Sequence, residues 1–155
     1  MKIFNLSLCK SGTTSLEVFL NKSYNLKKYP YYHLFYNNKV AINEVFNNKD
    51  FSKIPNVNDY DLFSDVPFNL FNSFKYFDKF YPDAKFILII RNLDDWIQSN
   101  IRWLEHLKEV GNGAEISLEK LFHNYQYYGA LQNYKVVDVE LLKKEYNDYH
   151  NSIFE

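Results

Sequence analysis

Hydrophobic and polar residues change their spacing along the chain, which predicts strands and helices in turn. Residues 2–8 (KIFNLSL) alternate between apolar and polar types and predict a strand. After the small polar segment 11–15, apolar residues recur at helical spacing up to Leu20 and predict a short helix. Between residues 21 and 60, prolines and asparagines interrupt the pattern, so we expect helical pieces joined by loops.

The second half of the chain has clearer periods. Residues 61–64 form a short candidate strand, and phenylalanines every three residues from Phe68 to Phe77 predict a helix that starts near Pro67. The continuous apolar run at residues 85–90 (KFILII) predicts a central parallel strand buried on both faces. Further helical patterns cover residues 93–107, 118–128 and 139–153.

Strands that alternate with helices predict an α/β fold with a mainly parallel central sheet flanked by helices. The length of 155 residues fits a single domain over residues 1–155. In such sheets, ligands bind beyond the carboxyl ends of the strands.

Composition and charge indicate which kinds of ligand or partner the chain is unsuited to bind. A net charge of −1 argues against a protein that coats nucleic acid and leaves room for a local anion site. Cys9 is the only cysteine, which excludes an internal disulfide and a multi-cysteine zinc site, and no ligand spacing indicates a metal. Without a signal-peptide pattern or an apolar run of about 18 residues, we expect a cytoplasmic protein that binds neither nucleic acid nor membrane.

The segment from Cys9 to Ser15 (CKSGTTS) lies between the first predicted strand and helix. Main-chain N–H groups and the helix dipole bind phosphate at such a junction, with Gly12 allowing close approach and Lys10 supplying a charge. Further hydrogen bonds come from the hydroxyls of Ser11, Thr13, Thr14 and Ser15. The alternative is a strand-to-helix turn with Ser and Thr as helix caps. A nucleoside triphosphatase loop fits poorly, because there the lysine follows the last glycine.

This segment resembles the phosphate loop of sulfotransferases, usually P-K-[ST]-G-T-[TS], with Cys9 in the place of the proline. The resemblance implies a three-layer sulfotransferase-like fold. It also implies that residues 11–15 hold the 5′-phosphate side of the donor 3′-phosphoadenosine-5′-phosphosulfate (PAPS), which leaves as PAP. Lys10 would contact the bridging oxygen of the phosphosulfate.

Sulfotransferases carry a second motif, an arginine at the end of a buried strand and a serine eight residues later. Arg91 and Ser99 have this spacing, and the resemblance implies that they bind the 3′-phosphate of PAPS. An arginine at a strand end can also bind phosphate with two parallel hydrogen bonds. The alternative is that Arg91 pairs with Asp94 or Asp95 and that Ser99 is an ordinary surface residue.

A base must take the proton of the acceptor hydroxyl. The segment FSDVP around Asp65 resembles the K-T-H-L-P segment of cytosolic sulfotransferases, with Asp65 in the place of the histidine base. Because the ordinary pKa of an aspartate is about 3.9, burial must raise it for this role. Alternatively, Asp65 caps the helix that starts near Pro67. Glu44 is the second candidate base and His33 the third.

The resemblance covers about residues 2 to 105, and many family members are longer. We therefore expect a minimal or truncated member, which either binds the donor more weakly or has its donor site completed by a partner subunit. A homodimer is one expected assembly. The acceptor is a small molecule, a glycan or a peptide with a hydroxyl or amine group, bound by residues 24–60 and the C-terminal helices. Candidates for stacking on adenine are Tyr29, Tyr31, Tyr32 and Phe35.

Two other functions compete with sulfuryl transfer. A nucleotide kinase is disfavoured, because Arg91 stands where such enzymes need an aspartate for Mg²⁺. A non-catalytic module that binds PAP or PAPS stays an alternative.

Overall fold

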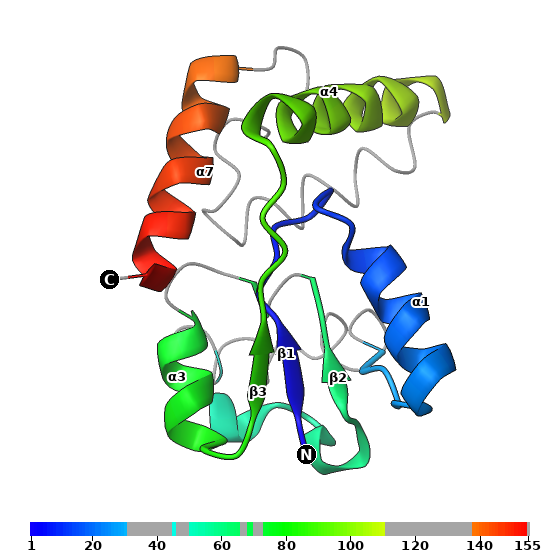
Figure 1. Cartoon of the computed structure of the whole chain (residues 1–155), viewed down its shortest axis with the longest axis vertical. Coiled ribbons are helices and arrows are strands. Elements are labelled where there is room, and N and C mark those ends of the chain that lie inside the picture. The colour runs from blue at the N-terminus through cyan, green and yellow to red at the C-terminus, as the bar shows by residue number, and fades with distance from the viewer. Residues whose placement is uncertain (31–44, 46–49, 66–67, 70–72, 111–137, 155) are drawn as a thin grey trace. The chain divides into compact units, whose positions relative to one another are not determined.

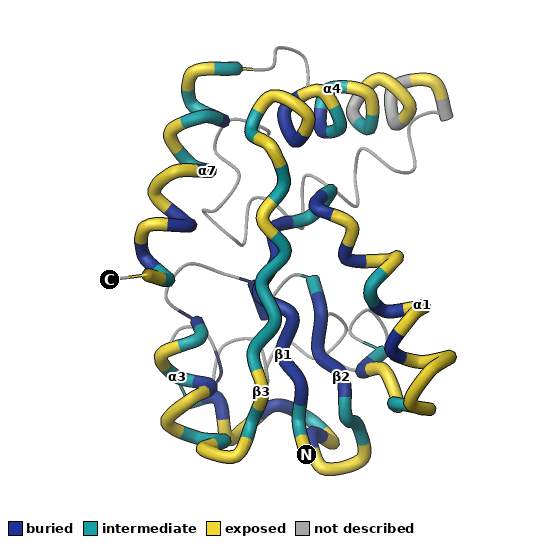
Figure 2. The backbone as a smooth tube through the Cα atoms, viewed as in Figure 1, coloured by how far each residue is buried: buried dark blue, intermediate teal, exposed yellow. Residues whose placement is uncertain are grey.

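The chain divides into two compact units, Met1–Ile90 and Arg91–Glu155. A computed structural model describes residues 1–30, 45, 50–65, 68–69, 73–110 and 138–154. Figure 1 shows the elements of each unit, and Figure 2 shows how far each residue is buried.

The first unit contains a parallel sheet of three short strands. These are β1 (Ile3–Asn5), β2 (Leu62–Phe63) and β3 (Lys85–Ile87), in the order β2-β1-β3. Both pairings are parallel, so the carboxyl ends of all three strands meet at one edge. The predicted α/β class with a parallel sheet is confirmed.

Helix α1 (Thr13–Tyr24) covers one face of this sheet. Ile3 lies opposite Leu62 in the register, and Leu20 of α1 packs with both in one buried cluster. The other side of α1 points to solvent, where Figure 2 shows it exposed. Burial of one apolar stripe therefore fixes α1 against the sheet.

Helix α3 (Ser73–Phe80) covers the opposite face. Phe4 follows Ile3 in β1, so its side chain points to the other side of the sheet. Its ring stacks on Phe63 of β2 at 4.8 Å and on Phe77 of α3 at 4.4 Å between centroids. Such pairs add about 0.5–1.5 kcal/mol each to simple burial. The unit is thus three-layered, as expected: helix, sheet, helix.

Two predicted strands differ from the observed ones. The alternation predicts a strand over residues 2–8, but β1 ends at Asn5, and the buried residues 6–8 that follow it form no strand. The apolar run at residues 85–90 predicts a central strand, but β3 ends at Ile87 and lies at the edge of the described sheet. The central strand is β1, which pairs with both β2 and β3.

The helix predicted from Pro67 also starts elsewhere. α3 begins at Ser73, while Phe68 and Asn69 lie in a turn that the carbonyl oxygen of Asp65 closes, accepting the N–H of Phe68 at 2.7 Å. Phenylalanines three residues apart therefore do not all lie on one helix. Phe68 contacts the ring of Phe4 from the turn, and Phe77 contacts the same ring from α3. Asp65 consequently does not occupy the N-cap of α3.

Of the four aromatic residues proposed for adenine stacking, the structure describes Tyr29. Its ring is buried among Tyr60, Phe63 and Phe68, and burial raises the pKa of its hydroxyl. Tyr29 is therefore a core residue, and its proposed role with adenine is wrong. Tyr31, Tyr32 and Phe35 lie outside the described residues.

The second unit contains two long helices that pack together, α4 (Leu93–Val110) and α7 (Val139–Phe154). Both confirm helices predicted from the period of apolar residues, and the pattern at residues 118–128 lies outside the described part. Trp96 of α4 is buried against Tyr146 of α7, with ring centroids 5.2 Å apart. None of the helices that the structure describes is both long and apolar enough to cross a membrane.

Candidate functional site

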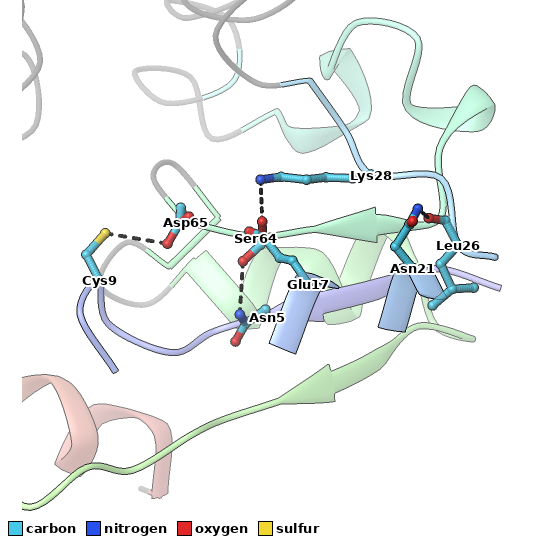
Figure 3. A network of polar contacts seen from close by, with 8 residues as sticks. All are labelled: Asn5, Cys9, Glu17, Asn21, Leu26, Lys28, Ser64 and Asp65. Carbon is cyan, nitrogen blue, oxygen red and sulfur yellow. Dashed lines mark hydrogen bonds and ion pairs between the residues drawn. The ribbon is translucent and has the colours of Figure 1, made fainter. Parts of the chain in front are cut away.

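The carboxyl edge of the sheet brings together two predicted site segments of the first unit. The loop from Cys9 to Gly12 joins β1 to α1, and Asp65 follows β2. Figure 3 shows the Cys9 and Asp65 side chains facing each other across this edge. This is the position at which parallel α/β sheets bind ligands.

The loop makes two left-handed steps before α1 begins. Lys10 has φ 68° and Gly12 has φ 98°, both in the region that most residues avoid. The Ser11 N–H donates to the carbonyl oxygen of Leu8 at 3.1 Å, which closes the turn around Lys10. The Leu16 N–H then donates to the Gly12 carbonyl oxygen at 3.0 Å, the first hydrogen bond of α1.

The amino end of α1 is open to an anion. Gly12 holds the N-cap position, no side chain among the described residues caps the helix, and its first turn contains no acidic residue. The N–H groups of the first turn of a helix have no partner within the helix, and the dipole makes this end positive. The alternative with Ser or Thr as the cap is therefore wrong.

The hydroxyls of the loop differ in their surroundings. Ser11 Oγ is buried and has no hydrogen-bond partner among the described residues, while Thr14 and Ser15 are exposed. A buried hydroxyl without a partner costs about 1–3 kcal/mol, which a bound oxyanion would recover. The loop therefore fits a phosphate group through main-chain N–H groups and the Ser11 hydroxyl.

Replacing Gly12 by alanine is expected to lower the free energy of unfolding by about 1–2 kcal/mol, the cost of a left-handed backbone for a residue with a Cβ atom. A Cβ atom at Gly12 would meet no described atom within 4 Å, so this cost is conformational and not a clash. Urea unfolding followed by circular dichroism measures it. Gly12→Asn is the control and is expected to lose less, because asparagine tolerates this conformation. Equal losses in both variants would contradict the conformational explanation.

Asp65 is largely buried beside the loop. Its Oδ1 atom accepts the Cys9 thiol at 3.6 Å, and the Thr13 side chain at the start of α1 also hydrogen-bonds to its carboxylate. Burial, and then the neighbouring Glu17 carboxylate, raise the pKa of Asp65 above its usual value. Thr13, Lys28 and Cys9 act in the opposite direction without cancelling this increase. Asp65 therefore has the environment that a carboxylate base requires.

Glu17 is a residue that the sequence analysis missed. It lies on α1 one turn after Thr13, is buried, and pairs with Lys28, whose side chain is about half exposed (Figure 3). Its other oxygen, Oε1, is buried without a partner among the described residues. The sequence signal for Glu17 was an acidic residue one turn into the helix after the loop. An ordinary solvent-exposed helix also carries acidic residues, so this signal does not indicate a buried site residue.

A buried polar layer lies beneath the loop and ties together the segments that follow the three strands. Asn5 Oδ1 accepts the Ser7 hydroxyl at 2.6 Å, and Asn5 Nδ2 donates to Ser64 Oγ at 2.9 Å. Ser7 Oγ accepts the N–H of Ile89 at 2.7 Å, and Asn69 Nδ2 donates to the Ser7 carbonyl oxygen at 3.0 Å. These bonds continue the connection of the strands past the end of the backbone pairing. Asn5 and Ser7 were visible as polar residues in an apolar segment, but local spacing does not indicate their partners, which lie far along the chain.

The remaining predicted site residues do not belong to the described part of the first unit. Arg91 and Ser99 belong to the second unit, Arg91 four residues beyond the end of β3 and Ser99 inside α4. Glu44 and His33 lie outside the described residues. Within the described part of the chain, no group of three or more His, Cys, Asp or Glu side chains could hold a metal ion.

The amino end of α4 contrasts with that of α1. Asn92 Oδ1 accepts the N–H groups of Asp94 and Asp95 at 3.0 and 3.2 Å, and both aspartates add negative charge to the first turn. This helix end is already capped and is unfavourable for an anion. A phosphate bound near Arg91 would therefore depend on side chains.

A three-layered parallel α/β unit with an open helix end after β1 offers a position suited to an anionic group at the carboxyl edge of its sheet. The sequence family with the description sulfotransferase domain matches residues 2–151. The chain belongs to this family, and the predicted relationship is confirmed. No curated protein matches the chain significantly.

Proposed function

We propose that the protein is an enzyme that transfers a sulfuryl group from PAPS to a hydroxyl or amine acceptor and releases PAP. Membership of the sulfotransferase domain family supports transfer of a sulfuryl group. The observation that carries the proposal is the open amino end of α1, with the unpartnered Ser11 hydroxyl, beside a buried carboxylate of raised pKa.

The residues of the first unit supply the two functions that sulfuryl transfer needs. The N–H groups of residues 12–15 and the Ser11 hydroxyl bind the 5′-phosphate, and Lys10 stabilises the negative charge that develops on the leaving phosphate. Asp65 accepts the proton of the acceptor group as the new bond to sulfur forms. Its raised pKa brings it closer to the pH at which a base works best.

Arg91 and Ser99 are proposed to bind the 3′-phosphate, which distinguishes PAPS and PAP from other adenine nucleotides. Since Asn92 and two aspartates occupy the amino end of α4, the guanidinium of Arg91 is the group of this segment suited to phosphate. Ser99 lies on α4 two turns after the start of the helix and is half-buried.

Binding of PAP tests the donor part of the proposal. We expect PAP to raise the melting temperature of the protein more than AMP does, and ATP with Mg²⁺ to have little effect. Arg91→Ala is expected to weaken PAP binding about 10- to 100-fold and AMP binding little, because a hydrogen bond to a charged group contributes about 1.5–3 kcal/mol. Arg102→Ala, at an exposed position of α4, is the matched control and should change neither affinity. Preference for ATP with Mg²⁺ would contradict the proposal.

Turnover is tested separately with sulfur-labelled PAPS and a panel of phenol, sugar, amine and tyrosine-peptide acceptors. Label in at least one acceptor is expected. Binding of PAP without any transfer would leave the non-catalytic module as the function and overturn the enzymatic part.

A further inference from the structure

The main chain at Arg91 is held by a residue far along the sequence. The hydroxyl of Tyr146, on α7, donates a hydrogen bond to the carbonyl oxygen of Arg91, 55 residues away in sequence. Both residues belong to the second unit, and Arg91 precedes α4, the helix that packs against α7.

Tyr146 is itself fixed from several sides. Its buried ring lies 5.2 Å from the ring of Trp96 and 4.1 Å from that of His150, measured between centroids. Because a carbonyl oxygen only accepts, His150 donates from Nδ1 to the Tyr146 carbonyl oxygen at 2.8 Å, and burial lowers the pKa of this ring. Burial also raises the pKa of Tyr146, so its hydroxyl keeps the proton that it donates to Arg91.

The segment that carries Arg91 needs such an anchor. Residues 88–92 lie between β3 and α4 and form no helix or strand. Asn92 is fixed by capping α4, since its Oδ1 atom accepts two N–H groups of the first turn. Tyr146 fixes the residue just before it. If the main chain at Arg91 were not held, the guanidinium would be spread over many positions, and ordering it on binding would weaken the affinity for phosphate.

We propose that Tyr146 is a positioning residue for the 3′-phosphate site, where its hydroxyl holds the main chain of Arg91 and thereby orders the guanidinium. This inference rests on the proposed function, because it takes Arg91 as the ligand of the 3′-phosphate. Tyr146 acts on the donor through Arg91 and needs no contact of its own with the nucleotide.

Tyr146→Phe removes the hydroxyl and keeps the ring between Trp96 and His150. We expect the dissociation constant of PAP to rise about three- to tenfold, the usual effect of one lost hydrogen bond, and that of AMP to stay unchanged. In the Arg91→Ala background the same change should have no further effect on PAP binding, because residues that act through one another are not additive. Isothermal titration calorimetry with PAP and AMP measures all four proteins of this cycle.

Ser152→Ala is the matched control. It removes another buried hydroxyl of α7, which donates to the Tyr149 carbonyl oxygen at 2.7 Å and not to the Arg91 segment. It is expected to leave the preference for PAP over AMP unchanged, even if it lowers the melting temperature. If Tyr146→Phe does not fold, Tyr146→Met fills the same space without a hydroxyl and serves in its place.

An unchanged affinity for PAP in Tyr146→Phe, or equal losses for PAP and AMP, would overturn the positioning role. An unchanged preference for PAP in Arg91→Ala would instead overturn the proposed 3′-phosphate site. The two failures are therefore distinguishable.

Discussion

Replacing Lys10 by alanine is expected to lower the rate of sulfuryl transfer by at least about 10²- to 10³-fold, the usual loss when a group that stabilises developing charge is removed. Lys10 stands in the left-handed turn directly before the open end of α1, where its ammonium adds to the positive helix end. The helix contributes partial charges only, so a full positive charge near the leaving phosphate has no substitute in the described loop.

The loss should fall on turnover more than on folding. Lysine and alanine both carry a Cβ atom, so the left-handed backbone at residue 10 costs about the same in each. Lys10→Met, which keeps the length of the side chain and removes its charge, is expected to be as inactive as Lys10→Ala. Lys22→Ala, at an exposed position in the last turn of α1, is the control and should remain active. Transfer by Lys10→Met at the wild-type rate would contradict the electrostatic role.

The features that the sequence predicted correctly are local ones. The periods of apolar residues give α4 and α7 over nearly their whole lengths. The loop before α1 was recognisable because its chemistry is contained in seven consecutive residues. Which residue caps α1 was left open by this segment, and the structure decides it, because Gly12 takes the N-cap position.

Long-range contacts explain what could not be predicted. Cys9 and Asp65 are 56 residues apart in sequence, and nothing in their residue types predicts that their side chains form a hydrogen bond. The start of α3 was misplaced because Phe68 reaches Phe4 from a turn, so that helical spacing was satisfied without a helix. The partners of Asn5 and Ser7 come from segments after the other two strands, which only the sheet brings together.

Asp65→Asn is expected to lower the rate of transfer about 10²- to 10⁴-fold, the contribution of a positioned base, and to stabilise the protein at neutral pH. Burial raises the pKa of Asp65, so the folded protein holds this proton more tightly than the unfolded chain does. Above the folded pKa of Asp65, the ionised carboxylate therefore lowers the free energy of unfolding, and this loss disappears below the ordinary aspartate pKa of 3.8. Asparagine removes the charge and keeps an oxygen for the Cys9 thiol.

The two effects have different dependences on pH. The melting temperature of Asp65→Asn should exceed that of the wild type at neutral pH, and the difference should shrink as the pH falls toward 3.8. Turnover of the wild type should rise with pH through the raised pKa of Asp65, because the base must be ionised to accept a proton. Asp78→Asn, at an exposed position of α3, is the control and should change neither quantity. An active Asp65→Asn enzyme together with an inactive Glu44→Gln enzyme would transfer the role of base to Glu44. If Asp65→Asn instead stabilises the protein and abolishes turnover, the buried charge costs stability and is retained because the chemistry requires it.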